Sequence, residues 1–170
     1  MAAGGPEIWF YEFVPPAEAA TEPPSDPVEK SHLAVVGVLA PLLEKCLARD
    51  WRAVVRSPQT DRLEALDVLL WSYSDDGFLP HGLVTDPQPE RQPVLLTHGP
   101  DRPNGAVVEF LLDDCDPGPL DGLVRSIRLF DGGDEGAKAA ARLRWPAAKA
   151  TGAPTTYWLR SDTGRWEKKA

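Results

Sequence analysis

The stretch Glu7-Ile-Trp-Phe-Tyr-Glu-Phe-Val14 decides the fold. It is rich in aromatic and β-branched side chains and is almost unbroken in apolar character, which is typical of a strand that is covered on both faces. We therefore expect residues 7–14 to form a central strand of a sheet whose two faces are both buried.

A helix and a second strand follow this stretch. From about residue 29 to Ala48 one apolar face recurs at helical spacing, in Leu33, Val36, Leu39, Leu42, Leu43 and Cys46. Residues 51–55 then have the pattern of a short strand. A strand, a helix and a strand almost always imply parallel pairing with a right-handed crossover. We predict a single α/β domain with a three-layer, Rossmann-like fold and a mostly parallel sheet.

The rest of the chain extends this pattern. Ser57-Pro58 predicts the start of a second helix, with serine as its cap and proline at its first position, that runs to Trp71. A last helix is expected from about Asp134 to Ala150. Further strands are predicted at residues 93–97, 106–112, 122–130 and 155–160, and proline-rich loops at about 15–27 and 85–104.

Composition limits the class of partner. The 170 residues carry a formal net charge of -8, so the whole molecule is repelled by phosphate backbones and anionic membranes. Any contact with DNA should be local or indirect. Cys46 and Cys115 form neither a disulfide framework nor a metal knuckle, and no apolar run approaches the ~20 residues of a membrane helix. We expect a soluble, cytoplasmic protein that does not bind membranes.

Signals for a cofactor, a metal or catalysis are weak. The turn 132–138 could cradle a phosphate, but its spacing is wrong for a Walker loop and the neighbouring carboxylates would repel an anion. No Gly-x-Gly-x-x-Gly follows the first strand. Asp113, Asp114 and Asp116 are better explained as a solvated turn than as Mg²⁺ ligands, and the three histidines lack the spacing of a triad or zinc site. We expect no cofactor, no metal and no catalytic residue; a nucleotide-using enzyme with Lys138 at phosphate is the alternative.

The last helix carries the main candidate site. Lys138, Arg142, Trp145 and Lys149 fall on one helical face, and no acidic residue lies between 138 and 149. A solvent-facing side with Trp145 half-buried on the sheet is the simplest interpretation. The functional interpretation is a site for a short acidic peptide, with Arg142 taking a carboxylate and Trp145 flanking an apolar anchor. Direct single-strand binding through Trp145 is a further alternative. Pro146 is predicted to kink or end this helix.

A second candidate surface is predicted around residues 71–81. A helical run ends in Trp71, and Phe78-Leu-Pro-His81 follows after a short polar break, so two large aromatic side chains lie on a turn. This placement predicts that another molecule docks there. His81 itself is expected to hydrogen-bond to the local backbone.

These residues resemble the chi subunit family of bacterial DNA polymerase III, an accessory component attached to the clamp loader. The resemblance rests on the aromatic first strand around Tyr11, the pair Arg62-Leu63, the pair Leu70-Trp71, the run Phe78-Leu79-Pro80-His81 that follows after six intervening residues, and the terminal helix that stops at Gly152. It covers most of the chain outside the two proline-rich loops.

The resemblance implies a non-catalytic subunit that links the clamp-loader assembly to the acidic C-terminal tail of single-stranded DNA-binding protein during DNA replication. The family's tail-binding positions fall on Lys138, Arg142, Trp145 and Lys149. Its contacts with the psi subunit, another clamp-loader component or a helicase fall on Trp71 and Phe78. The resemblance also implies that DNA is contacted only indirectly, by a monomer within a hetero-complex. Asp131 departs from the family, because it replaces an apolar pocket position and would disfavour an acidic tail.

Overall fold

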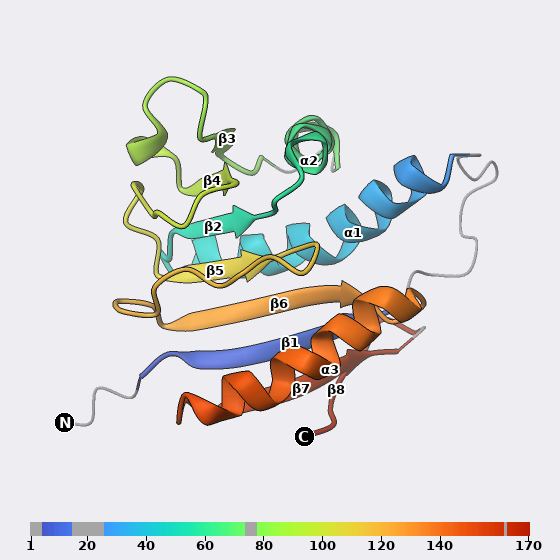
Figure 1. Cartoon of the computed structure of the whole chain (residues 1–170). Coiled ribbons are helices and arrows are strands. Elements are labelled where there is room, and N and C mark those ends of the chain that lie inside the picture. The colour runs from blue at the N-terminus through green and yellow to red at the C-terminus, as the bar shows by residue number, and fades with distance from the viewer. Residues whose placement is uncertain (1–4, 15–25, 74–77, 162) are drawn as a thin grey trace.

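One eight-stranded sheet lies between two layers of helix in the computed structural model, which describes residues 5–14, 26–73, 78–161 and 163–170 (Figure 1). Most of the predicted loop at 15–27 lies outside the described residues. The elements are β1 (Glu7–Phe13), α1 (Pro27–Ala48), β2 (Ala53–Arg56), α2 (Thr60–Ser72), β3 (His81–Leu83), η1 (Pro89–Arg91), β4 (Val94–Thr97), β5 (Val108–Leu111), β6 (Arg125–Asp131), α3 (Glu135–Ala150), β7 (Thr155–Arg160) and β8 (Trp166–Lys168).

The strand order is β3-β4-β2-β5-β6-β1-β7-β8, and every pair is parallel except β7 with β8. β1 lies between β6 and β7, as expected for an apolar strand that is buried on both faces. The predicted α/β fold with a mostly parallel sheet is confirmed. The first crossover joins parallel strands, but β5 and β6 lie between β1 and β2 in the sheet.

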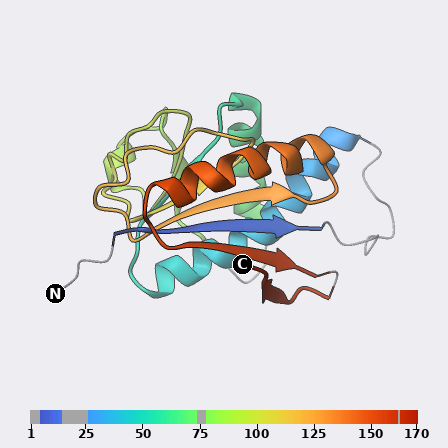
Figure 2. The ribbon, with the colours of Figure 1, turned by 60° about the horizontal axis from the view of Figure 1, so that its bottom comes forward.

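The helices divide between the two faces of the sheet. α1 and α2 pack together on one face, and α3 lies across the other (Figure 2). The alternation of side chains along β1 serves both layers: Tyr11 and Phe13 belong to the core under α1, whereas Ile8 and Phe10 belong to the core under α3. The continuous apolar run that predicted the central strand therefore consists of two alternating sets of side chains, one for each face of the sheet.

Helix α1 differs from one expectation. By length and composition alone it is long and apolar enough to cross a membrane, whereas no such run was expected. Its inward side chains make it a core helix of this fold, because they are buried against the sheet and α2. These side chains are Val35, Val36, Val38, Leu39, Ala40, Leu42, Leu43 and Cys46.

Three local features differ from what the sequence suggested. Helix α2 begins at Thr60 rather than Pro58, with Gln59 as its N-cap; Ser57 Oγ accepts the Gln59 N–H at 3.1 Å before the helix starts, and its hydroxyl donates to Asp113 Oδ2 at 2.6 Å. The three-residue strands β3 and β8 were missed. Of the kink or end predicted at Pro146, the end does not occur: helix α3 continues to Ala150, the predicted limit of the helix, with the proline side chain exposed to solvent.

A buried ion pair lies on the sheet face that α3 partly covers. Arg56 Nε donates to Glu109 Oε2 at 3.1 Å, and both side chains are almost fully buried. Ser126 Oγ donates to the other carboxylate oxygen at 2.7 Å, and Arg56 also donates to the carbonyl groups of Gly99 and Asp101. These bonds attach the loop after β4 to the sheet.

Candidate functional site

Three of the four predicted residues of the last helix line one hollow, and the fourth, Lys149, lies next to Trp145. Asp134 caps α3 by accepting the Ala137 N–H at 3.1 Å, which fixes the start and phase of the helix. Lys138, Arg142 and Trp145 then line a hollow of about 360 Å³, together with side chains from β1 and β7. Lys149 Nζ lies 5.0 Å from the centroid of the Trp145 ring, one turn further along.

Trp145 anchors the helix to the sheet as well as lining the hollow. Its ring is half-buried and makes edge-to-face contacts with Phe10 at 5.2 Å and with Tyr157 at 5.8 Å between centroids. The packing role expected of a half-buried tryptophan is therefore present. The part of the indole that remains exposed is flanked by cations, which is the arrangement that an apolar anchor with acidic neighbours would need.

One carboxylate that the sequence pattern did not single out lies in this hollow. Glu12, on β1, is only 7% exposed, and its Oε1 is 3.8 Å from Lys138 Nζ with no hydrogen-bond donor within the described residues. Lys138 is thus partly neutralised. Within the described ranges neither Arg142 nor Lys149 makes an ion pair, and both are exposed. The positive charge available to a ligand comes mainly from these two residues.

Tyr157 supplies a neutral hydroxyl to the same hollow. Burial and then the nearby Glu12 carboxylate raise the pKa of Tyr157 to about 12, while Arg142 acts in the opposite direction. At neutral pH the phenol is fully protonated. The hollow supplies a hydroxyl, an indole face and the exposed Arg142, and Lys149 adds a second exposed cation beside the indole, a set that suits carboxylates flanking an apolar side chain.

Arg144 lies apart from this group although it is on the same helix. Its guanidinium donates to Asp114 Oδ1 at 3.0 Å and to Asp116 Oδ1 at 2.8 Å, and these hydrogen bonds raise its pKa. Asp113 is likewise occupied, by Arg62 and Ser57. The three aspartates considered as Mg²⁺ ligands thus serve as acceptors for arginine and serine side chains.

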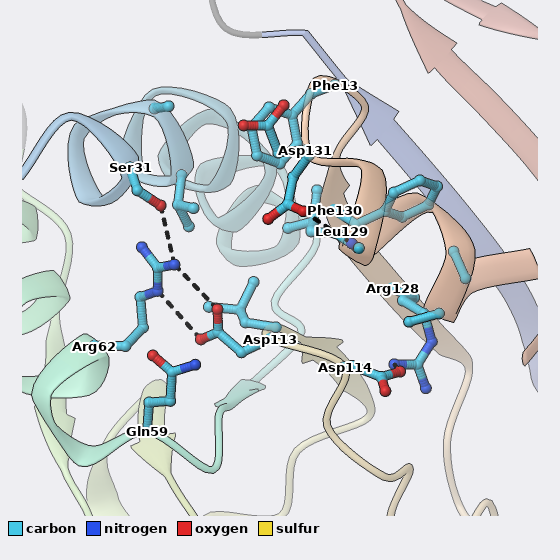
Figure 3. A pocket seen from close by; sticks show the side chains of 18 residues that line it. Phe13, Ser31, Gln59, Arg62, Asp113, Asp114, Arg128, Leu129, Phe130 and Asp131 are labelled. Carbon is cyan, nitrogen blue, oxygen red and sulfur yellow. Dashed lines mark hydrogen bonds and ion pairs between the residues drawn. The ribbon is translucent and has the colours of Figure 1, made fainter. Parts of the chain in front are cut away.

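A second crevice opens at the carboxyl ends of β1, β5 and β6, where open α/β sheets commonly bind ligands (Figure 3). Its volume is about 430 Å³. Arg62 projects toward it but is bound bidentately by Asp113, at 3.1 and 3.0 Å, and also donates to Ser31 Oγ at 3.1 Å. Several carboxylates line the crevice and Lys138 does not. This chemistry is unfavourable for the phosphate of a nucleotide.

Asp131 belongs to this crevice rather than to the hollow beside Trp145. It ends β6, and its Oδ1 accepts the Gly133 N–H at 2.7 Å in the turn before α3. The carboxylate that was expected to oppose an acidic peptide is therefore not among the residues that line the hollow. Glu12 is the carboxylate that does line it.

The second predicted surface is an exposed apolar patch on the side of α2. Trp71 is 54% exposed and Phe78 is 72% exposed, with their ring centroids 5.7 Å apart, and Val68 adds a further exposed side chain. Beneath them, buried His81 places Nδ1 2.7 Å from the Leu79 carbonyl and Nε2 3.0 Å from the Asp67 carbonyl. The expected backbone contact of His81 is present, and the imidazole supports the Trp71 ring at 4.5 Å.

Comparison with known proteins agrees with the resemblance in the sequence. The family model described as "DNA polymerase III chi subunit, HolC" matches residues 6–156. A Rickettsia prowazekii (strain Madrid E) protein named "Probable DNA polymerase III subunit chi" is 33% identical over 89 residues, which cover 52% of this chain and 54% of that protein. The chain therefore spans about half the length of this curated relative. Because the family match runs from the start of β1 into β7 and includes both candidate surfaces, the chain belongs to the DNA polymerase III chi subunit family.

Proposed function

We propose that this chain is a non-catalytic accessory subunit of the bacterial DNA polymerase III holoenzyme. In this role it links the clamp-loader assembly to the acidic C-terminal tail of single-stranded DNA-binding protein during replication, in the cytoplasm. Family membership supports the general role. The observation that carries the tail site is the pair of exposed cations, Arg142 and Lys149, beside the half-buried Trp145 in a chain of net charge -8.

The tail would bind along α3 with its apolar residue in the hollow. Arg142 is placed to take a carboxylate bidentately, and Lys149 adds a second charge beside the indole. Tyr157 can donate its hydroxyl hydrogen to the peptide. Glu12 opposes the acidic residues and offsets Lys138, so the complex should be of modest affinity and sensitive to salt.

Titration of a fluorescently labelled peptide that ends in acidic residues and phenylalanine tests this site. Arg142→Ala should lower its affinity by about 30-fold, equivalent to roughly 2 kcal/mol for a lost charged pair. Arg165→Ala is the matched control, because it removes an exposed arginine from the turn before β8 and should change the affinity less than about twofold. Equal binding by wild type and Arg142→Ala would remove α3 as the tail site.

The patch formed by Val68, Trp71 and Phe78 is proposed to attach the chain to the rest of the holoenzyme. Its partner would be a psi subunit, another clamp-loader component or a helicase, with this chain as a monomer in the hetero-complex. Contiguous exposed aromatic side chains are the usual anchors of protein interfaces, which supports this assignment. DNA would be contacted through single-stranded DNA-binding protein.

A further inference from the structure

A third hollow lies on the α1 side of the sheet, between the C-terminal end of α1 and strands β1, β7 and β8. It has a volume of about 260 Å³ and belongs to neither surface of the proposed function. Four of the six tryptophans of the chain line it, together with one tyrosine. We name this site the aromatic basket, and its rings are Trp9, Tyr11, Trp51, Trp158 and Trp166.

The rings of the aromatic basket are held in place by strand register. Trp9 and Tyr11 alternate onto the same face of β1, and Trp158 pairs with Tyr11 in the neighbouring strand. Trp166 stacks on Tyr11 with centroids 4.2 Å apart and planes at 28°, and the Trp9 and Trp158 centroids are 5.8 Å apart. The walls are therefore formed before any ligand arrives.

The aromatic basket is positively charged although the protein is acidic. Arg125 lies over the Trp9 ring at 3.5 Å, Arg49 lies over the Trp51 ring at 4.9 Å, and Lys45 completes the lining. No carboxylate is among the described lining residues; Glu7, outside the lining, is 3.4 Å from Arg125. An anionic group is therefore favoured next to these rings, despite the net charge of the whole molecule.

Two buried donors of the aromatic basket lack acceptors. Arg125 Nε and Trp158 Nε1 are both shielded from solvent, and neither has a hydrogen-bond partner within the described residues. Buried donors of this kind are normally satisfied, and leaving one unpaired is costly. Both atoms belong to residues that line the hollow, so a ligand that displaces the groups covering them would supply acceptor atoms as well as negative charge at the rim.

We infer that the aromatic basket binds an unpaired nucleobase, with the adjoining phosphate at Lys45 and Arg49. A base offers a planar face for stacking on indole and carbonyl or ring-nitrogen acceptors for the two buried donors. A phenylalanine or aliphatic side chain of an acidic peptide would fill the space and leave these donors unpaired. The inference goes beyond the proposed function, in which DNA is contacted only indirectly.

The test uses a short labelled oligothymidylate, titrated at low salt and followed by anisotropy and by tryptophan fluorescence. Saturable binding with quenching of the tryptophans is expected, with an affinity that falls as salt is raised. Lys45→Glu should weaken binding at least about fivefold. Lys30→Glu, near the other end of α1, makes the same change of net charge and should leave the affinity within about twofold.

Variants at Trp51 test stacking separately from charge. Trp51→Ala should lower the affinity at least about fivefold, while Trp51→Phe, which keeps a π face, should retain most of it. Circular dichroism melting shows whether each variant is folded. Because Lys45 and Arg49 are exposed, their variants test the site even if Trp51→Ala unfolds the chain.

Competition with thymidine monophosphate distinguishes a free nucleotide from a nucleic-acid strand as the source of the base. Competition by the mononucleotide assigns the site to a single nucleotide unit, and binding of the oligomer alone assigns it to a strand; both support the inference. The inference is overturned if the oligonucleotide shows no saturable binding at low salt, or if Lys45→Glu and Lys30→Glu lower its affinity equally. It is also overturned if the aromatic basket binds an acidic peptide instead, that is, if Lys45→Glu abolishes the binding of such a peptide. Arg142→Ala should spare oligonucleotide binding, so this test and that of the tail site can fail independently.

Discussion

Glu12 is the residue on which the charge of the tail site depends. Its buried carboxylate lies 3.8 Å from Lys138 and is one cause of the raised pKa of Tyr157. Glu12→Gln should lower the pKa of Tyr157 from about 12 toward its ordinary value, although burial will keep part of the shift. Alkaline titration of phenolate absorbance measures this change. An unaltered titration curve would show that burial alone accounts for the shift.

The same residue should control peptide affinity. Removing the Glu12 charge releases Lys138 and abolishes the repulsion of an acidic peptide, so Glu12→Gln should bind the tail severalfold more tightly. Glu167→Gln, an exposed carboxylate on β8, is the charge-matched control and should have little effect. Weaker binding by Glu12→Gln would mean that the carboxylate organises the hollow instead of opposing the ligand.

Tyr157 also makes stability depend on alkaline pH. Its folded-state pKa of about 12 lies above the unfolded value, so the unfolded chain loses this proton first as the pH rises. The contribution of Tyr157 to the free energy of unfolding is therefore complete below about pH 10 and is lost between about pH 10 and 12. Thermal melts over this range should show a smaller loss in Glu12→Gln than in wild type.

The Arg56 and Glu109 pair predicts the largest effect of a single substitution on stability. Glu109→Ala leaves a buried guanidinium without its counter-charge and should reduce the free energy of unfolding by about 3–5 kcal/mol. Glu167→Ala breaks an exposed pair with Lys169 and should cost less than about 1 kcal/mol. Urea denaturation of both variants compares the two pairs directly, and similar losses would contradict the difference expected from burial.

At the scale of elements, Pro146 is the irregular position of α3. It lacks the N–H that would bond to the Arg142 carbonyl, yet the helix continues around it. Pro146→Ala should therefore stabilise the protein by roughly 2 kcal/mol. Alanine is much more favourable than proline inside a helix, and this gain is partly offset because the unfolded chain becomes more flexible without the proline. Pro154→Ala, in the loop before β7, should give no such gain in urea denaturation. A destabilised Pro146→Ala variant would indicate that the ring packs productively.

The elements that could be predicted were those with long repeating patterns. The apolar run of β1 and the helical spacing in α1 and α3 are local properties, so the sequence was sufficient to place them. β3 and β8 have three residues each, too few for a period to be recognised. Ser57 had the pattern of a cap, but its oxygen accepts the Gln59 N–H in a turn that precedes the helix, and its contact with Asp113, far along the chain, could not be read from local sequence.

The candidate sites divide in the same way. The face shared by Lys138, Arg142 and Trp145 follows from helical spacing alone. Glu12 reaches the hollow only because β1 lies beneath α3, although a carboxylate inside an apolar strand was a signal that could have been noticed. The aromatic basket could not be predicted, because strand register and order alone bring its tryptophans together from four separate segments.

At the scale of the whole molecule, the two surfaces of the proposed function lie on opposite sides of the sheet. Helix α2, which carries the patch at Trp71 and Phe78, packs with α1 on one face, and α3, which carries the tail site, packs on the other. The two proposed partners should therefore be able to occupy the chain at the same time. Phe78→Ala should leave affinity for the acidic peptide within about twofold of wild type in the same titration. A larger change would show that the two faces are energetically coupled through the sheet.

The position of β1 has a consequence for synthesis on the ribosome. Its neighbours β6 and β7 come late in the chain, and the contact between Glu7 and Arg125 joins residues 118 positions apart. β1 must therefore wait, unpaired and largely apolar, until β6 and β7 have been translated. During that interval the nascent chain exposes an aromatic segment of the kind that aggregates or is held by chaperones, so its yield in cells should depend on translation speed.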